Sequence, residues 1–282
     1  MIEVNNVHKK FNQKVVLKGI HLKISKGEIF GLLGPSGAGK TTLIKILTGQ
    51  LEFEEGSVKI LNKSVKELTG EDRKKLGIMM EQFGLYDRFS CMDNLKIFAE
   101  IYRIPYNKVK ESLSMVGLEA AAKIPACKLS KGMRSRLQLA RVFMHTPQII
   151  FLDEPTSGLD PATSRAIHQM IIAKKEEGCT IFLTTHDMEE ATKLCDHVAL
   201  LNEGKIVEYG SPQEICTKYN HQKRIRLRLY DGRNLDFTHA KDSASEIYSL
   251  LLKEQVETIH SSEPNLETVF LELTGRCLQD NE

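Results

Sequence analysis

The stretch Gly34-Pro-Ser-Gly-Ala-Gly-Lys-Thr-Thr42 decides the fold of this chain. It matches the spacing G-x-x-x-x-G-K-[ST], in which the glycines allow successive backbone N–H groups to converge on a phosphate. The apolar residues 28–33 before it predict a buried strand, and residues 41–47 after it predict a helix whose N-terminus faces the anion. The sequence therefore predicts a nucleotide phosphate site between a strand and a helix.

The side chains of this loop have separate expected roles. Lys40 can reach the β- and γ-phosphates, and the Thr41 hydroxyl can bind Mg²⁺. The whole loop is expected to contact the nucleotide, through Gly34, Pro35, Ser36, Gly37, Ala38, Gly39, Lys40, Thr41 and Thr42. A chance glycine-rich turn is the alternative, and the strand–loop–helix setting argues against it.

Bulk properties restrict the class of protein. A chain of 282 residues can form one large domain and a small one, and 41% hydrophobic residues can supply its core. The net charge of +2 predicts no strong attraction to nucleic acid or anionic lipid. No signal peptide and no run of about 18 apolar residues is visible, so we expect a soluble chain whose membrane role would come through a partner.

The cysteines contain no C-x-x-C pair, which favours reduced thiols over a disulfide framework or a metal site. They are Cys91, Cys127, Cys179, Cys195, Cys216 and Cys277.

The order of predicted elements indicates an α/β fold. Residues 1–33 have the pattern of an N-terminal antiparallel β region, and residues 88–145 that of a helical insertion. Apolar strands are predicted at 149–152, 180–184 and 197–201, with helical segments between them. This alternation predicts a mostly parallel sheet.

The composition changes near residue 220, which divides the chain into a domain at 1–215 and a small α+β unit at 221–282. A hairpin around Asp231-Gly232 and helices at 243–253 and 266–273 are expected there. Arginines alternate with apolar residues in its first strand. A solvated strand face is favoured over nucleic-acid binding, because acidic residues flank the arginines and no aromatic ladder is present.

A second constellation lies at Ile149-Ile-Phe-Leu-Asp-Glu154, an apolar strand that ends in two carboxylates. Asp153, at the strand tip, is placed to hold Mg²⁺, and Glu154 is placed to polarise an attacking water. An acidic pair at a strand end is common by itself. After a phosphate loop in an α/β chain it favours hydrolysis.

A third constellation, Leu129-Ser-Lys-Gly-Met133, stands directly before a helical run. Ser130 and the backbone of Gly132 lie where a helix N-terminus presents N–H donors, so they could form a second anion site. A plain N-cap by Ser130 is the alternative. The segments Ser157-Gly-Leu-Asp160 and Thr184-Thr-His186 complete the set.

Together these segments resemble an ATP-binding cassette (ABC) ATPase across residues 1–215, with its P-loop NTPase core. The resemblance implies ATP as nucleotide and Mg²⁺ held by Thr41, Gln82 and Asp153. It further implies that Gln82 touches the attacking water and links it to the helical insertion. His186 would contact the γ-phosphate beside the catalytic Glu154 and Lys40.

Two further roles follow from the same resemblance. Phe11 matches the aromatic residue that stacks on adenine, although an ordinary core phenylalanine is the alternative. Asp160 matches the loop residue that communicates across a dimer.

The chain departs from the usual family signature Leu-Ser-Gly-Gly-Gln, because Lys131 and Met133 occupy its third and fifth positions. The phosphate-facing Ser130 and Gly132 are kept, whereas Met133 has no amide to contact a nucleotide sugar. This variant, and the tail at residues 263–275, resemble cassette subunits of drug and antibiotic exporters, which work with a separate permease of the ABC-2 type.

The family resemblance also implies partners. Two ATP molecules would hold a head-to-tail homodimer, or a pair of cassette subunits, and hydrolysis would open it. A separate transmembrane permease would place the chain in the cytoplasm, on the inner face of the membrane, with no nucleic acid partner. The residues Phe83, Leu85, Tyr86 and Phe89 are expected either to form part of a permease groove or to pack in the core.

Other functions stay open on the sequence alone. A soluble ABC ATPase acting on ribosomes or nucleic acid usually carries two cassettes or a coiled-coil insertion, and neither is visible. A non-hydrolysing ATP-binding regulator is disfavoured by Glu154 and His186. An importer ATPase remains the weakest alternative. The C-terminal unit could stabilise or regulate a dimer.

Overall fold

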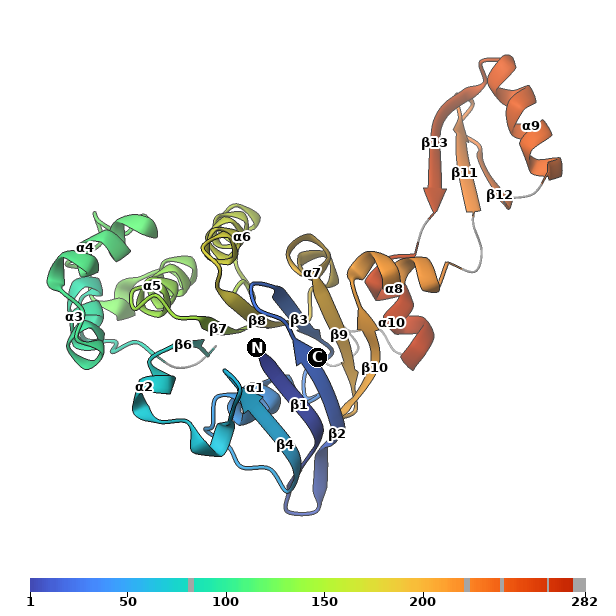
Figure 1. Cartoon of the computed structure of the whole chain (residues 1–282). Coiled ribbons are helices and arrows are strands. Elements are labelled where there is room, and N and C mark those ends of the chain that lie inside the picture. The colour runs from blue at the N-terminus through green and yellow to red at the C-terminus, as the bar shows by residue number, and fades with distance from the viewer. Residues whose placement is uncertain (81–83, 221–223, 239–240, 263, 276–282) are drawn as a thin grey trace.

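The structure is a computed structural model, and Figure 1 shows its arrangement. The residues that it describes are 1–80, 84–220, 224–238, 241–262 and 264–275. Gln82, Phe83 and Cys277, which the sequence analysis singles out, lie outside the described residues.

A six-stranded sheet in the order β10-β9-β3-β8-β7-β6 forms the centre of the molecule. Its neighbouring strands are parallel except for the edge pair of β9 and β10. The strands are β3 (Ile29–Leu33), β6 (Leu76–Met79), β7 (Ile149–Asp153), β8 (Thr180–Thr185), β9 (His197–Asn202) and β10 (Lys205–Gly210). β3, β7 and β8 are buried along their whole length, which is typical of strands covered on both faces. The expected mostly parallel α/β sheet is confirmed.

Successive side chains of these strands enter two different hydrophobic cores, because they alternate between the faces of the sheet. Phe30 and Phe182 pack on one face, toward α1 and the N-terminal strands. Leu33 and Leu183 pack on the other face, where the cluster includes residues of several helices. The helices of this layered body are α1 (Lys40–Leu47), α5 (Lys131–Phe143), α6 (Pro161–Glu176) and α7 (Met188–Leu194).

The N-terminal region forms the expected antiparallel sheet, in the order β2-β1-β4-β5. Its strands are β1 (Ile2–Phe11), β2 (Lys14–Ile24), β4 (Glu55–Ile60) and β5 (Lys63–Ser64). A 3-10 turn at Val65–Glu67 and the short helix α2 (Gly70–Arg73) lead from it to β6.

The predicted helical insertion has a hydrophobic core of its own, to which Leu95, Leu113 and Leu137 contribute. It contains α3 (Cys91–Tyr102), α4 (Tyr106–Met115), a 3-10 turn at Ala126–Lys128 and α5. α3 begins after Ser90, whose hydroxyl accepts a hydrogen bond from the Asp93 N–H at 3.1 Å and so caps the helix. Figure 1 shows this insertion beside β6, at one edge of the central sheet.

Beyond the opposite edge of the sheet, the C-terminal segment builds a small unit (Figure 1). After α8 (Pro212–Lys218) the chain forms an antiparallel sheet in the order β12-β11-β13, together with α9. These elements are β11 (Arg224–Leu229), β12 (Asn234–Thr238), α9 (Lys241–Leu252) and β13 (Val256–Ser262). The expected hairpin is present, and Arg226 and Arg228 pair with Asp236 and Glu257 at 2.8 and 2.9 Å, as a solvated strand face would.

The last helix, α10 (Leu266–Thr274), returns to the larger body. Its Val269 and Phe270 are fully buried in the same cluster as Ala191 and Leu194 of α7. The small sheet and α9 are therefore inserted between two helices that pack on the body. The expectation that residues 221–282 form one separate domain stays a prediction. α10 lies within that range and packs on the larger body.

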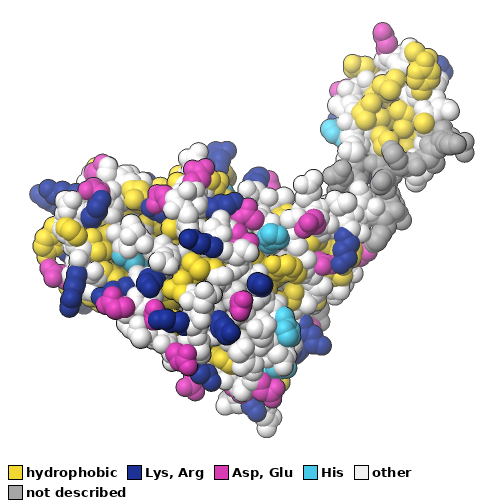
Figure 2. Space-filling model, in the orientation of Figure 1, with side chains coloured by type: hydrophobic (Ala, Val, Ile, Leu, Met, Phe, Trp, Pro, Cys, Tyr) yellow, Lys and Arg dark blue, Asp and Glu magenta, His cyan; other side chains and the backbone are white. Residues whose placement is uncertain are grey.

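The surface carries charges of both signs. Figure 2 shows Lys and Arg side chains interspersed with Asp and Glu over the visible face of the larger body, in keeping with a net charge of +2. Within the described part of the chain, no helix has the length and apolar character needed to cross a bilayer.

Candidate active site

The phosphate loop joins β3 to α1, as the sequence predicts. Gly39 has a φ of 114°, and a Cβ at this position would lie 2.8 Å from Leu17, so only glycine fits. The next residue, Lys40, starts the helix and is 7% exposed. Its ammonium donates hydrogen bonds to the carbonyls of Gly34 at 2.6 Å and Pro35 at 3.3 Å, which curls the loop around the charge.

The same ammonium reaches the carboxylate expected to be the base. Lys40 Nζ lies 3.2 Å from Glu154 Oε1, and the other oxygen, Oε2, lies 2.8 Å from His186 Nδ1. Lys40, at the start of the helix that follows β3, thus forms one chain of contacts with Glu154 and His186, which directly follow β7 and β8. Parallel strands bring them together, since their carboxyl ends meet at one edge of the sheet.

Glu154 has an unusual backbone for a glutamate, with a φ of 50°. Residues other than glycine seldom adopt this left-handed conformation, and where they do it concentrates at functional sites. The Glu154 N–H donates to the Thr184 carbonyl at 3.1 Å, which ties this backbone to β8. The side chain is 14% exposed and therefore held in a largely desolvated position.

A group of oxygen atoms suitable for a metal lies beside this cluster. The Thr41 hydroxyl donates to Asp153 Oδ2 at 3.0 Å, and the Thr184 hydroxyl donates to Oδ1 at 2.6 Å. Asp153 is 3% exposed. Oxygen atoms of this kind suit Mg²⁺, which usually takes only one or two protein ligands beside water and phosphate. Thr41 and Asp153 fit the ion; the third expected ligand, Gln82, lies outside the described residues.

Contact with Glu154 raises the pKa of His186 above its ordinary value, mainly through the hydrogen bond and against the opposing effect of burial. Because folding raises this pKa, the contribution of the pair to stability is complete below about pH 6.5. It is lost as the pH rises through the raised value.

We expect the midpoint of the His186 titration, followed by NMR of the imidazole, to fall in a Glu154→Gln protein without nucleotide. Glutamine keeps the shape but removes the charge that favours the imidazolium. Glu176→Gln, an exposed change at the end of α6, serves as the control and should leave the midpoint where it is. Equal midpoints in the parent and Glu154→Gln would contradict the pairing.

The third constellation lies at the start of α5. Ser130 accepts a hydrogen bond from the Met133 N–H at 3.2 Å and so acts as the N-cap. A Cβ on Gly132 would lie 2.9 Å from Thr163 of α6, so glycine permits close packing of the two helices. The N-cap alternative is thus present, while Ser130 and Gly132 as an anion site remain a prediction.

Asp160 caps α6. Its carboxylate accepts hydrogen bonds from the N–H groups of Ala162 and Thr163, both at 3.0 Å, and from the Thr163 hydroxyl at 2.6 Å. The hydroxyl contact is the main reason why the pKa of Asp160 lies below its usual value. Asp160 is therefore an anion with a local structural role, and its expected role across a dimer remains a prediction.

Phe11 ends β1 and is 46% exposed, so it is not an ordinary core phenylalanine. The ammonium of Lys9 lies 5.1 Å from the centre of its ring. An exposed ring is available to stack on a base, and this stacking remains a prediction.

Residues of the site that the sequence interpretation did not single out are Thr156, His168 and Glu190. Glu190 is 4% exposed and contacts both other side chains. The only sequence signal was a carboxylate four residues after His186 at the start of a helix. That spacing does not reveal a contact with α6.

Comparisons with known proteins agree with this geometry. The family model described as ABC transporter matches residues 17–157. A fluoroquinolones export ATP-binding protein of Mycobacterium tuberculosis is 40% identical over 93% of this chain and 88% of its own length. The linearmycin resistance ATP-binding protein LnrL of Bacillus subtilis is 30% identical over 99% of this chain and all of its own length.

Solved structures give the same picture. An ATP-binding subunit of an ABC transporter superposes with a TM-score of 0.71 at 25% identity, covering 78% of this chain and 93% of its own. A dimeric ATP-binding cassette in a post-hydrolysis state, bound to ADP and Pi, gives a TM-score of 0.68 at 28% identity, covering 75% of this chain and 98% of its own. By sequence, fold and site alike, this chain belongs to the ABC transporter family as an ATP-binding, ATP-hydrolysing subunit.

Proposed function

We propose that this chain hydrolyses ATP to power the export of a drug, an antibiotic or another amphiphilic compound through a separate ABC-2-type permease. The observation that carries the proposal is the convergence of Lys40, Glu154 and His186 beside the Thr41–Asp153 pair. The names of the relatives, which refer to export of fluoroquinolones and resistance to linearmycin, support export and this class of compound.

The reaction follows from the positions of the charged groups. The γ-phosphate of ATP competes with Glu154 for the ammonium of Lys40, because both are anions. Once released from Lys40, the Glu154 carboxylate accepts a proton from the water that attacks the γ-phosphate, and ADP leaves. Thr41 and Asp153 would hold Mg²⁺, which would supply neutralising charge for the phosphate. His186 orients Glu154 and donates toward the same phosphate.

We infer that two copies enclose the nucleotides head to tail. The N-terminus of α5, at Ser130 and Gly132, offers N–H groups to an anion. Ser130 is exposed on the surface of the helical insertion, so it is open to the nucleotide of a second copy. The dimeric structural neighbour supports such a pair. By linkage, ATP that binds the pair better than the monomer stabilises the pair.

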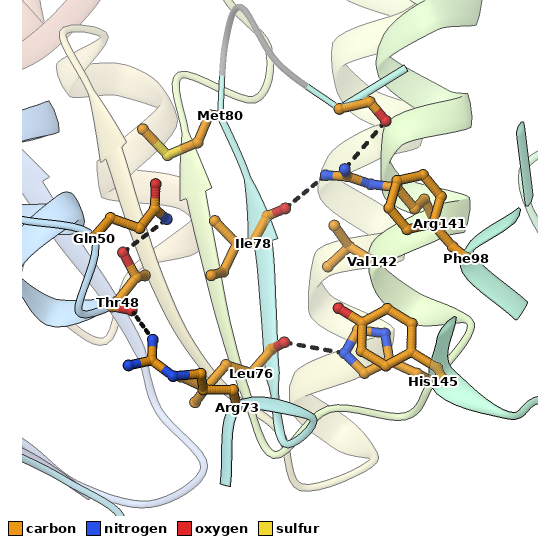
Figure 3. A pocket seen from close by; sticks show the side chains of 12 residues that line it. Thr48, Gln50, Arg73, Leu76, Ile78, Met80, Phe98, Arg141, Val142 and His145 are labelled. Atoms are coloured by element: carbon orange, nitrogen blue, oxygen red, sulfur yellow. Dashed lines mark hydrogen bonds between the residues drawn. The ribbon is translucent and has the colours of Figure 1, made fainter. Parts of the chain in front are cut away.

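We infer further that the permease docks in a cavity of about 340 Å³ between the central sheet and the helical insertion (Figure 3). Arg141 spans it, donating to the carbonyls of Gly84 at 3.1 Å and Ile78 at 2.7 Å. Phe98 packs against this guanidinium, and Phe98 also contacts the ring of Tyr86, which is 51% exposed. The wall thus continues to the exposed Tyr86, one of the residues for which the sequence left a permease groove and core packing both open.

The charged residues that line this cavity indicate which kind of permease segment would bind there. Among the residues that the structure describes, its lining contains Arg73, Arg141 and His145 and no carboxylate. Burial lowers the pKa of His145, which leaves the arginines as the cationic groups. A permease segment that presents a carboxylate and an aromatic or apolar side chain is complementary to it.

Charge reversal at the rim tests this docking. Arg73 is exposed, so Arg73→Glu should lower co-purification of the permease at least about tenfold, because a like-charge contact replaces an attractive one. ATP binding by the isolated chain should not change. Lys110→Glu, an exposed reversal on α4 outside the cavity, is the control. Equal loss in both variants would contradict docking at this cavity.

Removal of the gene tests the function as a whole. The deleted strain should become sensitive to one or more amphiphilic antibiotics, and the parent gene but not a Lys40→Ala gene should restore resistance. Pull-down of the tagged chain should recover a membrane protein. ATP turnover stimulated by ribosomes and not by membranes would instead favour the soluble class of ABC ATPase.

A further inference from the structure

Glu190 connects three segments around the active site. It lies on α7, and its side chain is 3% exposed. Oε1 accepts hydrogen bonds from the hydroxyl of Thr156, in the loop after β7, and from Nε2 of His168 on α6, the latter at 2.8 Å. A buried carboxylate is costly unless it is hydrogen-bonded, and both of these contacts end on Oε1, whereas Oε2 is buried with no hydrogen-bond partner among the described residues.

The main chain of Glu190 is tied to the turn that carries His186. The Glu190 N–H donates to Asp187 Oδ1 at 2.9 Å, and the Asp187 N–H donates to the Thr185 hydroxyl at 3.0 Å. Asp187 follows His186 directly and caps α7. A movement of Glu190 would therefore move the residues on both sides of His186.

The carboxylate of Glu190 is tied to the loop that carries Glu154. Thr156 follows Glu154 by two residues, and Glu154 itself has the left-handed φ of 50°. Such a conformation persists only where its surroundings hold it. The hydrogen bond from Thr156 to Glu190 is one restraint on this loop, and it comes from a different helix.

The pKa of Glu190 lies below its usual value. Burial by itself raises this pKa, but the hydrogen bonds from His168 and Thr156 favour the charged form and lower it. A charged acceptor makes stronger hydrogen bonds than a neutral one. Loss of the charge therefore loosens the contacts without removing much volume.

A cavity of about 560 Å³ lies alongside this cluster, and Glu154, His186 and Glu190 all contribute to its wall. The wall also contains the loop from Ser157 to Leu159 that leads to Asp160. The groups expected to act in hydrolysis and the loop expected to face a second subunit thus line the same cavity.

We propose that Glu190 is a positioning residue, which holds the Glu154 loop and the His186 turn in fixed relation for ATP hydrolysis. It does not touch the nucleotide. It acts by keeping the base and the histidine within the 2.8 Å contact that joins them. This inference rests on the proposed roles of Glu154 and His186.

The test compares two neighbouring glutamates. Glu190→Gln should lower kcat for ATP about 10- to 100-fold, because small displacements of catalytic groups cost that much. The KM and the affinity for ATP should change by less than about twofold, since the phosphate loop is untouched. Glu189→Gln is the matched control, because Glu189 lines the same cavity but is exposed and forms its ion pair with Lys193 on the same helix. It should keep the parent kcat.

A second pair of variants covers the case in which Glu190→Gln does not fold. Thr156→Val removes the hydroxyl and should lower kcat with KM unchanged, whereas Thr156→Ser keeps the hydroxyl and should restore it. Parent kcat in both Glu190→Gln and Thr156→Val would overturn the inference. Loss of ATP affinity in parallel with kcat would also overturn it, because that pattern indicates general damage. If Glu154→Gln itself turned ATP over normally, the proposed catalytic roles would fail instead.

Discussion

Replacing Lys40 by alanine is expected to abolish ATP-dependent dimerisation and to weaken ATP binding about 10- to 100-fold. Lys40 is the buried cation of the phosphate loop, and hydrogen bonds to a charged group contribute about 1.5–3 kcal/mol each. Its ammonium already sits among the carbonyls of Gly34 and Pro35 and the carboxylate of Glu154. Removing it leaves the phosphates without their main cation. Light scattering with and without ATP, and a fluorescent-nucleotide titration, measure the two effects.

Lys45→Ala provides the control for this experiment. Lys45 lies in the last turn of the same helix, α1, five residues and more than one helical turn after Lys40. The charge change is the same as in Lys40→Ala, but dimerisation and ATP affinity should be those of the parent. Unchanged ATP affinity and turnover in Lys40→Ala would show that the loop does not bind the phosphates.

The sequence was sufficient to predict the centre of this fold for a physical reason. The strand before the phosphate loop and the strand ending at Asp153 are continuous apolar runs, which is how strands buried on both faces look. Once both are placed in a parallel sheet, their carboxyl ends meet at one edge. The positions of these two strands are therefore enough to predict that Thr41, Asp153 and Glu154 lie close together.

Other parts of the structure depend on contacts that no local pattern records. β13 (Val256–Ser262) was not predicted, because five of its seven residues are polar and its pairing partner, β11, lies about thirty residues earlier. The return of α10 to the larger body depends on which surface Val269 and Phe270 find. An amphipathic helix pattern predicts a buried face, but it does not say what covers that face.

The site shows the same division between local and distant information. Loop and strand-end motifs were enough to predict which residues would bind phosphate and Mg²⁺. They did not predict that Lys40 and Glu154 contact each other, at 3.2 Å. Nor did they indicate Glu190, whose role depends on three segments meeting in space. Residues that support a site through contacts between helices leave little trace in sequence spacing.

The contact between Lys40 and Glu154 leads to the second large effect. Glu154→Gln should lower ATP turnover about 10²- to 10⁴-fold, because glutamine cannot accept the proton of the attacking water. It should not weaken ATP binding. The parent carboxylate competes with the γ-phosphate for Lys40, and the neutral amide competes less. ATP affinity should therefore equal or exceed that of the parent, and ATP-bound dimers should accumulate.

Single-turnover hydrolysis and light scattering in ATP separate these two outcomes. Lys40→Ala and Glu154→Gln should both be inactive, yet the first should remain monomeric in ATP and the second should remain dimeric. Glu189→Gln removes a carboxylate from the neighbouring helix and should behave as the parent does. A Glu154→Gln protein that cleaves ATP at the parent rate would mean that another group activates the water. One that fails to dimerise would mean that Glu154 serves binding, and the competition for Lys40 would then have no role in the cycle.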